Sequence, residues 1–392
     1  LEGDIKGFFD NINHEWLCRN VPMDKTILRK WLNAGVIDKK HFAETKAGTP
    51  QGGIISPCLA NATLNGLENQ LKAHFAQTIG ATKSKKLGLQ VVRYADDFVI
   101  TAFSKELLEN EVQPWVEQFL SVRGVALSKE KTRITHINTG FDFLGWNFRK
   151  YVPESPNKKA KLLIKPSTKN AQAFYRKVAD IIKNSGTMTQ DALIGQLNPV
   201  LRGWAEYHSP VVAKETFNTL DYHIFWRIWR WAKRRHPNKS TNWIRKRYFR
   251  SIGERSWVFA ITYKLQSGEV RYRRLYGLAN TPIVRHKRLP GNYNPYDAEH
   301  ELKWEVLRVQ RMQHKLRYRN ETCWIFLRQK GLCAFCGGAI SKQTGWHDHH
   351  IVRRVDGGSN SRENRALLHP NCHASVHSRG CTEKLQFSGI QE

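Results

Sequence analysis

Two adjacent carboxylates inside an apolar stretch place the strongest constraint on how this chain can fold. Asp96 and Asp97 lie within 89–103, a run rich in aromatic and β-branched residues. An unpaired carboxylate is costly to bury, so the pair should lie at a turn or face a cation. A turn between Ala95 and Phe98 would bring both carboxylates to one tip, where divalent metal for phosphoryl transfer could bind. The alternative is an Asp-Asp turn in an ordinary hairpin.

The charge balance indicates a polyanionic partner. The 392 residues include 63 Lys and Arg against 34 Asp and Glu, a formal net charge of +29. The chain also contains 13 Trp, 12 Tyr and 18 Phe, many of them among the basic residues. Because phosphate contacts and base stacking use these side chains, nucleic acid is the expected partner. The alternative is a generically basic protein.

Chain length and cysteine usage limit the number of domains and the classes of protein to which this chain can belong. A chain of 392 residues that is 40% hydrophobic can form two or three domains with real cores. No apolar run has the length of a membrane span and no signal peptide is evident, so we expect no membrane partner and a cytoplasmic (bacterial) or organellar location. Most of the Cys residues gather with His near the C-terminal end, a metal pattern rather than a disulfide framework.

Short strands, turns and helices are expected over the first 150 residues. Asp4 ends a short strand, and Asp10 or Asn11 is expected to cap the helix around 14–18. A Gly-rich loop then precedes a helix that Ser56 would cap, but the loop lacks the Gly-Lys-Ser/Thr of a phosphate-binding loop.

Five ordered segments resemble the palm of a reverse transcriptase of the group II intron kind. They are 4–12, 48–57, 94–97, 127–132 and 143–145. The resemblance implies that Asp4, Asp96 and Asp97 hold two Mg²⁺ ions, which suit carboxylate and phosphate oxygens. These ions would activate the primer 3′-hydroxyl and stabilise the leaving pyrophosphate.

The same resemblance implies contacts to the nucleotide and the template. Phe9 matches the ring that excludes a ribose 2′-hydroxyl, Gln51 would lie along the template or the incoming base pair, and Lys131 would touch the nucleotide phosphates. A core aromatic and a solvated lysine are the alternatives for Phe9 and Lys131. The family's finger blocks should precede Asp4 and are absent, and the chain begins at Leu1 without an initiator Met. We therefore expect a fragment that is not a competent polymerase by itself.

Residues 165–255 are expected to be helical, with helices over 171–184, 190–201 and 214–235. The segment 202–208 and the Trp- and Arg-rich helix after it resemble the thumb, or maturase, domain of group II intron proteins. The resemblance implies binding of structured intron RNA and assistance to splicing. The alternative is an ordinary helical bundle with a solvated basic face.

The flanking segments are expected to connect domains. Residues 153–166 are polar, basic and Pro-containing and predict a linker. Residues 257–276 predict a small hairpin with Gly268 in its turn. A basic helix over 301–319 occupies the position of the family's DNA-binding region, so we expect it to contact DNA; the alternative is a solvated helix.

Two close pairs of soft ligands predict a structural Zn²⁺ site near the C-terminus. Cys333-x2-Cys336 is followed by His369-x2-Cys372, a spacing that suits a tetrahedral ion. A variant in which Cys381 replaces His369 stays open, as does the interpretation that all nearby Cys and His only bind zinc.

The surrounding segment resembles an HNH nuclease with the ββα-metal fold. The resembling residues are the Cys pair, 348–351, 357–358, Asn364 and 369–377. His350 matches the general base that activates water, and Asn364 the residue that orients it. Three further histidines, His349, His373 and His377, match the family's ligands of one catalytic divalent ion. We expect Mg²⁺ there, although a His-rich site also admits transition metals. Asp348 would support the site or be a surface carboxylate.

Together these segments resemble a group II intron-encoded protein with an α+β multidomain fold. The expected domains are a partial reverse transcriptase palm of a right-hand polymerase (1–152), a helical thumb/maturase domain (165–255), a DNA-binding or connecting region (256–325) and a small zinc-containing ββα-metal HNH endonuclease domain (326–380). The implied partners are intron RNA, target DNA and dNTPs, with the oligomeric state open between monomer and dimer. Two alternatives stay open: an HNH nuclease with a polymerase-inactive palm, and an RNA-binding splicing factor without chemistry.

Overall fold

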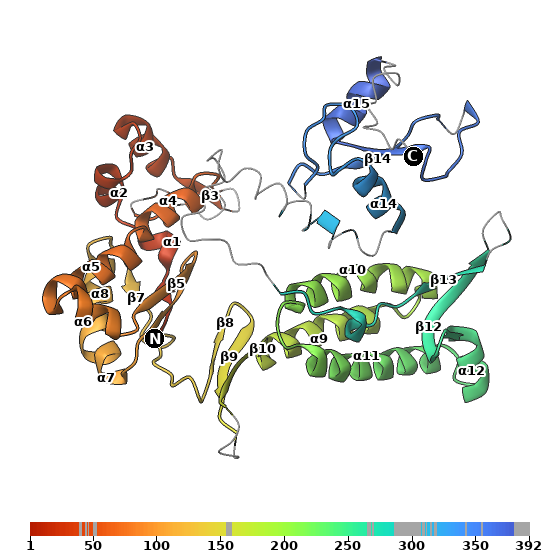
Figure 1. The fold of residues 1–392 in the computed structure, drawn as a ribbon, viewed down its shortest axis with the longest axis horizontal. Helices are drawn as coiled ribbons and strands as arrows, with labels where there is room; N and C mark the ends of the chain where they lie inside the picture. Colours follow the sequence, from red (N-terminus) through yellow and green to blue (C-terminus); the bar gives the residue numbers. More distant parts are fainter. Residues whose placement is uncertain are drawn as a thin grey trace. The chain divides into compact units, whose positions relative to one another are not determined.

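The computed structural model of the chain describes residues 1–38, 41–43, 45, 47–49, 53–153, 159–264, 268, 270–285, 307, 310, 312–313, 316, 320–341, 343–353 and 356–379. The chain divides into two compact units, Leu1–His286 and Lys287–Glu392. The fold is mixed α/β, with antiparallel strand pairs in both units (Figure 1).

The N-terminal part of the first unit packs helices against short antiparallel sheets. Its central sheet has the order β1 (Glu2–Gly3), β6 (Asp97–Thr101), β5 (Gln90–Tyr94), and β2 (Ile5–Lys6) pairs with β7 (Ala126–Leu127), and β3 (Val36–Asp38) with β4 (His41–Ala43). The helical segments are α1 (Phe8–Asn11), α2 (His14–Asn20), α3 (Lys25–Leu32), α4 (Ser56–Leu64), α5 (Leu67–Ile79), α6 (Ala81–Lys86), α7 (Lys105–Leu107), the π-helical η1 (Leu108–Val112) and α8 (Gln113–Ser121). Phe98 and Ile100 of β6 are buried in the same core as Leu71 and Phe75 of α5.

The predicted helix starts in this part need correction. Asn13, and neither Asp10 nor Asn11, caps α2, because its side chain accepts from the Trp16 backbone N–H at 2.9 Å. The two predicted residues belong to α1, where the Asn11 amide donates to the Gly7 carbonyl at 2.8 Å. Ser56 is the first residue of α4 and Ile55 occupies the N-cap position, so the predicted cap at Ser56 was wrong by one residue.

A second sheet overturns the predicted linker. β8 (Phe141–Phe143), β9 (Trp146–Tyr151) and β10 (Lys161–Pro166) form an antiparallel sheet in the order β10-β9-β8. The expectation of a linker over 153–166 was wrong for β10, which pairs with β9 from Lys161↔Tyr151 to Pro166↔Trp146. Its apolar centre, 162–164, has strand propensity that the flanking Pro and Lys residues concealed in the sequence.

Helices dominate the rest of the first unit. They are α9 (Thr168–Asn184), α10 (Gln190–His208), α11 (Lys214–Arg235) and α12 (Thr241–Tyr248), followed by the sheet β11 (Phe249–Ile252), β12 (Arg255–Lys264), β13 (Val270–Arg274) and the 3-10 helix η2 (Leu278–Asn280) (Figure 1). Helix α10 continues past the predicted end at Leu201 and includes all of 202–208. The predicted hairpin over 257–276 is confirmed as β12 and β13.

In the described part of the second unit, a strand pair and the helices α14 (Asn320–Arg328) and α15 (Pro370–Arg379) enclose a small core. α14 packs against β15 (Arg365–Leu368), which pairs with β14 (His347–His350), and α15 packs against β14 (Figure 1). Phe326, Leu367 and Val376 are buried in its core. Most of the predicted basic helix over 301–319 lies outside the described residues, as does Cys381.

Candidate active sites and nucleic-acid interface

The two adjacent aspartates lie at the tip of a tight hairpin. Strands β5 and β6 pair up to Tyr94↔Asp97, so Ala95 and Asp96 form the turn. Ala95 has φ +54°, the left-handed backbone conformation that a residue with a Cβ seldom adopts. The turn brings the carboxylates of Asp96 and Asp97 to one end of the central sheet.

Asp4 joins them because of how β1 pairs with β6. The register Gly3↔Phe98 directs the next residue, Asp4, toward Asp97. Gly3 is needed for this pairing, since a Cβ there would collide with the Phe98 ring. Burial raises the pKa of Asp97, the carboxylates of Asp96 and Asp4 raise it further, and the Lys131 ammonium opposes them.

This carboxylate cluster fits a divalent cation. Lys131 Nζ lies 3.2 Å from Asp4 Oδ2 and its charge also acts on Asp97, so the Lys131 ammonium faces two of the three acidic groups. A bound dication would remove the repulsion that now raises the pKa of Asp97. In the described part of the chain, however, the groups whose ligand atoms all lie within 4.8 Å of one another are both in the second unit. The carboxylates would therefore have to move together to share an ion.

Phe9 lies beside the Gly-rich loop. Its ring is half-buried and meets Phe8 edge-on at a centroid distance of 5.6 Å. Its carbonyl accepts from the Thr49 backbone N–H at 2.6 Å, and a Cβ at Gly48 would collide with that carbonyl. The loop can approach this closely only because Gly48 has no side chain. Gln51 lies outside the described residues.

A buried histidine that sequence reasoning missed links α10 to the β8–β9 turn. His208 Nδ1 lies 3.0 Å from Trp146 Nε1, and its Nε2 lies 3.0 Å from Asn170 Oδ1. The Tyr207 hydroxyl donates to the Leu144 carbonyl at 2.6 Å, and its ring stacks on Trp146. Burial lowers the pKa of His208 to about 4, so the ring is neutral near pH 7. No metal or substrate motif in the sequence signals this residue.

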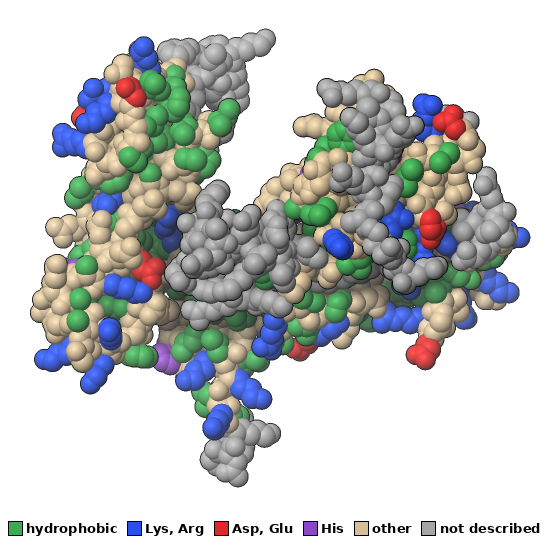
Figure 2. Space-filling view, turned by 45° about the horizontal axis from the view of Figure 1, so that its top comes forward, with side chains coloured by type: hydrophobic (Ala, Val, Ile, Leu, Met, Phe, Trp, Pro, Cys, Tyr) green, Lys and Arg blue, Asp and Glu red, His purple; other side chains and the backbone are tan. Residues whose placement is uncertain are grey.

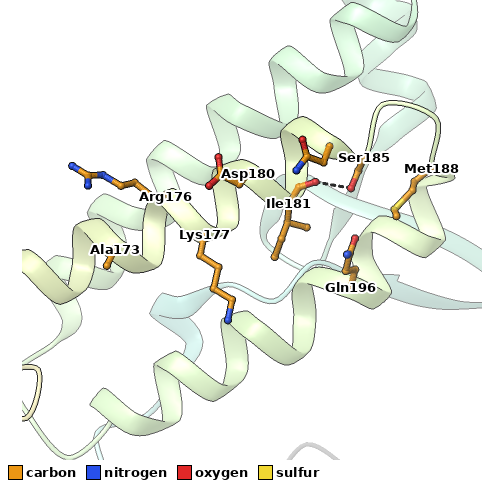
Figure 3. Close-up of a pocket in the computed structure, with 9 residues that line it drawn as sticks. Ala173, Arg176, Lys177, Asp180, Ile181, Ser185, Met188 and Gln196 are labelled. Carbon is orange, nitrogen blue, oxygen red and sulfur yellow. Dashed lines mark hydrogen bonds between the residues drawn. The ribbon is translucent and has the colours of Figure 1, made fainter. Parts of the chain in front are cut away.

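Basic and aromatic side chains cover much of the first unit's helical part. In Figure 2, Lys and Arg side chains outnumber Asp and Glu on the visible face. Tyr222 and Trp226 of α11 and Trp243 of α12 are exposed large aromatics. A hollow of about 570 Å³ lies on α9 and α10, and Arg176 extends away from α9 beside it (Figure 3). Such a surface suits phosphate contacts and base stacking.

In the second unit, the four predicted soft ligands come together. Cys333, Cys336, His369 and Cys372 each offer an atom within 4.8 Å of the others. The His369 Nε2 lies 3.2 Å from the Ala339 carbonyl, which leaves Nδ1 facing Cys336 Sγ at 3.3 Å. Burial and the neighbouring cysteines raise the pKa of the Cys372 thiol to about 12. A bound dication would offset that repulsion, and the donor set fits Zn²⁺.

The three predicted histidine ligands form a second cluster. His349, His373 and His377 bring ring nitrogens within 4.8 Å of one another, with 3.2 Å between the Nε2 atoms of His373 and His377. Burial, then the neighbouring His373 and His377, lower the pKa of His349 to about 4, so one ring nitrogen has a free lone pair at neutral pH. His349 Nε2 is buried and has no hydrogen-bond partner among the described residues. An orphaned buried nitrogen beside two other imidazoles fits a metal ligand.

The predicted base has a polar partner that the sequence did not indicate. His350 is the last residue of β14, and its Nε2 lies 2.9 Å from Asn360 Oδ1. The Asn364 side chain instead accepts from the Val352 backbone N–H at 2.8 Å and donates to the Ser359 carbonyl at 2.7 Å. Asn364 thus ties the start of the loop after β14 to Ser359, the residue before Asn360. No motif in the sequence pointed to Asn360.

A pair of charged residues braces β14 against β15. Arg365 Nε donates to Asp348 Oδ1 at 2.9 Å, and its Nη2 forms a second bond to the same carboxylate. Arg365 Nη1 also reaches Glu321 of α14 at 2.7 Å. Arg365 holds both carboxylate oxygens of Asp348, so Asp348 supports the strand that carries His349 and His350.

Comparison with family models finds three consecutive matches. Residues 1–148 match a reverse transcriptase (RNA-dependent DNA polymerase) model, residues 171–249 a group II intron maturase-specific domain, and residues 333–379 an HNH endonuclease. No helix of the described residues is long and apolar enough to cross a membrane.

Similar named proteins come from bacteria and eukaryotes. Protein YkfC of Escherichia coli is 31% identical over 37% of this chain and 45% of its own length. Group II intron-encoded protein LtrA of Lactococcus lactis is 27% identical over 57% of this chain and 50% of its own length. Maturase-like protein 1 of Euglena gracilis is 28% identical over 57% of this chain and 43% of its own length. The chain thus spans about half the length of these relatives.

Proposed function

Because this chain belongs to the group II intron-encoded proteins that combine reverse transcriptase, maturase-specific and HNH endonuclease domains, we propose that it serves intron splicing and mobility. Its first unit would bind intron RNA and extend a DNA primer with dNTPs. Its second unit would cut one strand of target DNA. The convergence of the residues around Asp97 and of the histidines around His349 supports this proposal most directly.

The polymerase part of the proposal rests on the carboxylates. Asp4, Asp96 and Asp97 would hold Mg²⁺, which when bound supplies charge stabilisation for phosphoryl transfer. Lys131, already 3.2 Å from Asp4, would shift to the nucleotide phosphates once a cation neutralises that carboxylate. Phe9 and Gln51 would contact the sugar and the template, and these two roles rest on the resemblance of their motifs. In this proposal the carboxylates and their sheet would form the palm of a right-hand polymerase.

In the proposed nuclease, His350 removes a proton from water. Its Nε2 faces Asn360 Oδ1, so Nδ1 would accept the proton. Asn364 would orient the base indirectly, because it fastens the loop that carries Asn360. A divalent ion on His349, His373 and His377, with Mg²⁺ our first choice, would supply stabilisation of charge on the scissile phosphate. Zn²⁺ on the four Cys and His ligands would hold the fold.

The helical part is proposed to bind the intron RNA as a thumb/maturase domain. Exposed aromatics of α11 and α12 lie among basic residues, which suits structured RNA. We also propose that the palm, the thumb/maturase domain, the connecting region and the HNH domain span 1–152, 165–255, 256–325 and 326–380, respectively. The proposed location is cytoplasmic or organellar.

Two substitutions test the two reactions separately. Asp97→Ala should abolish primer extension, in the chain or in a version extended by finger blocks, and leave DNA nicking intact. His350→Ala should do the reverse. Retained extension by the Asp97 variant would favour the nuclease with an inactive palm. If the wild type performs neither reaction yet promotes splicing, the chain acts as a splicing factor only.

A further inference from the structure

Arg93 is tied to the catalytic hairpin by its guanidinium group. It lies in β5 just before Tyr94, and its Nη1 donates to the Ala95 carbonyl at 3.0 Å and to Asn61 Oδ1 at 3.0 Å. Its Nη2 donates to Asn65 Oδ1 at 3.3 Å. One side chain therefore joins the turn to α4 through three contacts.

The two asparagines that accept from Arg93 lie on a helix that is anchored in the core. Asn61 lies on α4 and Asn65 is the residue that ends it, so the two amides follow one another on the same face of the helix. Leu59 and Leu64 of α4 are buried in the core of the N-terminal part. The asparagines are thus fixed points against which Arg93 can hold the turn.

The turn needs such a contact because of its backbone. Ala95 has φ +54°, which is unfavourable for a residue with a Cβ, and Asp96 follows it directly. A small relaxation of Ala95 would redirect the Asp96 carboxylate and change its approach to Asp97 and Asp4. The Arg93 bond to the Ala95 carbonyl opposes that relaxation.

We propose that Arg93 is a positioning residue that fixes the Ala95–Asp96 turn so that the carboxylates can share a divalent ion. The inference rests on the proposed polymerase function. Its three acceptors are uncharged, and the cation that acts on Asp97 is Lys131. The role is therefore geometric, and a lysine, which has the charge without the planar fork, cannot reproduce it.

Iron-directed cleavage tests this without requiring polymerisation. Fe²⁺ bound in place of Mg²⁺, with ascorbate and peroxide, generates radicals that cut the backbone near the ion. The 392-residue wild type should be cut close to Asp97, and Asp97→Ala should abolish that cut. Arg93→Lys should weaken the cut roughly tenfold at equal Fe²⁺, the usual effect of losing a residue that orients metal ligands.

Matched controls separate positioning from unfolding. Arg149→Lys changes a strand arginine of β9 that donates to the Asn138 carbonyl at 2.9 Å, and it should leave the cut unchanged. A double Asn61→Ala/Asn65→Ala variant keeps Arg93 but removes two of its acceptors. It should weaken the cut as Arg93→Lys does, with the melting temperature of each variant as the measure of folding.

The cleavage and the melting temperatures together distinguish a failure of the positioning role from a failure of the metal site. Wild-type cleavage by Arg93→Lys at a normal melting temperature overturns the positioning role, while the proposed function survives. Should Arg93→Lys unfold, the double asparagine variant decides, and wild-type cleavage by it overturns the role. Absence of the cut near Asp97 in the wild type refutes the metal site of the proposed polymerase, and the inference about Arg93 fails with it.

Discussion

Acid should destabilise the helical part of the first unit through His208. Asn170 Oδ1 accepts from Trp204 Nε1–H at 2.8 Å and also faces His208 Nε2 at 3.0 Å, so His208 Nε2 carries the proton. Nδ1 then accepts from Trp146 Nε1–H at 3.0 Å. A second proton on the ring would place two N–H groups against each other and bury a charge. Burial accordingly lowers the pKa of His208 to about 4.

The sign and size of the effect follow from this pKa. In the unfolded chain the His208 pKa returns to 6.5, so between about pH 6.5 and 4 the unfolded state binds more protons. The stabilisation is complete above pH 6.5 and is lost as the pH falls toward 4. The whole shift corresponds to about 3 kcal/mol, of which about 2 kcal/mol is lost between pH 7 and pH 5.

Urea unfolding followed by Trp fluorescence measures this loss. His208→Gln keeps an acceptor and a donor but cannot titrate, so its free energy of unfolding should fall by about 2 kcal/mol less than that of the wild type between pH 7 and pH 5. Other acid-sensitive groups are common to both proteins and cancel. Equal pH dependence of wild type and His208→Gln would refute the reasoning.

Three further substitutions test other parts of the molecule. Ala95→Gly should raise the free energy of unfolding by about 1 kcal/mol in urea melts, because glycine adopts the left-handed conformation without a Cβ clash; an unchanged or lower value would contradict this. Cys336→Ser should abolish bound zinc, measured by mass spectrometry, and lower the melting temperature of the second unit; full retention would exclude the four-ligand site. Gly358→Ala should strongly reduce nicking while primer extension persists, because its Cβ would collide with the Val352 carbonyl; wild-type nicking would contradict that packing.

The sequence was sufficient to predict those structural features whose geometry is set by the spacing of residues alone. The hairpin at Asp96 and the helix Lys214–Arg235 follow from local patterns, and both are present. The Cys333 and His369 pairs, far apart in the chain, were recognisable because each pair has the spacing of ligands for one ion. In such cases a few neighbouring residues are enough to predict the local structure or the ligand pair.

Other features depend on partners that only the fold brings together. β10 gains its strand conformation by pairing with β9, although its flanks resemble a linker. His208 is polar in the sequence, but its two bonds come from β9 and α9. Asn360 approaches His350 only because the loop after β14 folds back. None of these contacts has a local sequence pattern that could have revealed it.

We propose that two separate metal-dependent centres of this chain serve one nucleic-acid pathway. The most direct measurement is cDNA synthesis and DNA nicking in one reaction, with an RNA template, an annealed DNA primer, a target duplex and Mg²⁺, for the wild type, Asp97→Ala and His350→Ala, each in a version extended by finger blocks. We expect Asp97→Ala to nick without making cDNA from the annealed primer, and His350→Ala to make cDNA without nicking. Loss of both activities in either variant, or retention of both, would contradict the account.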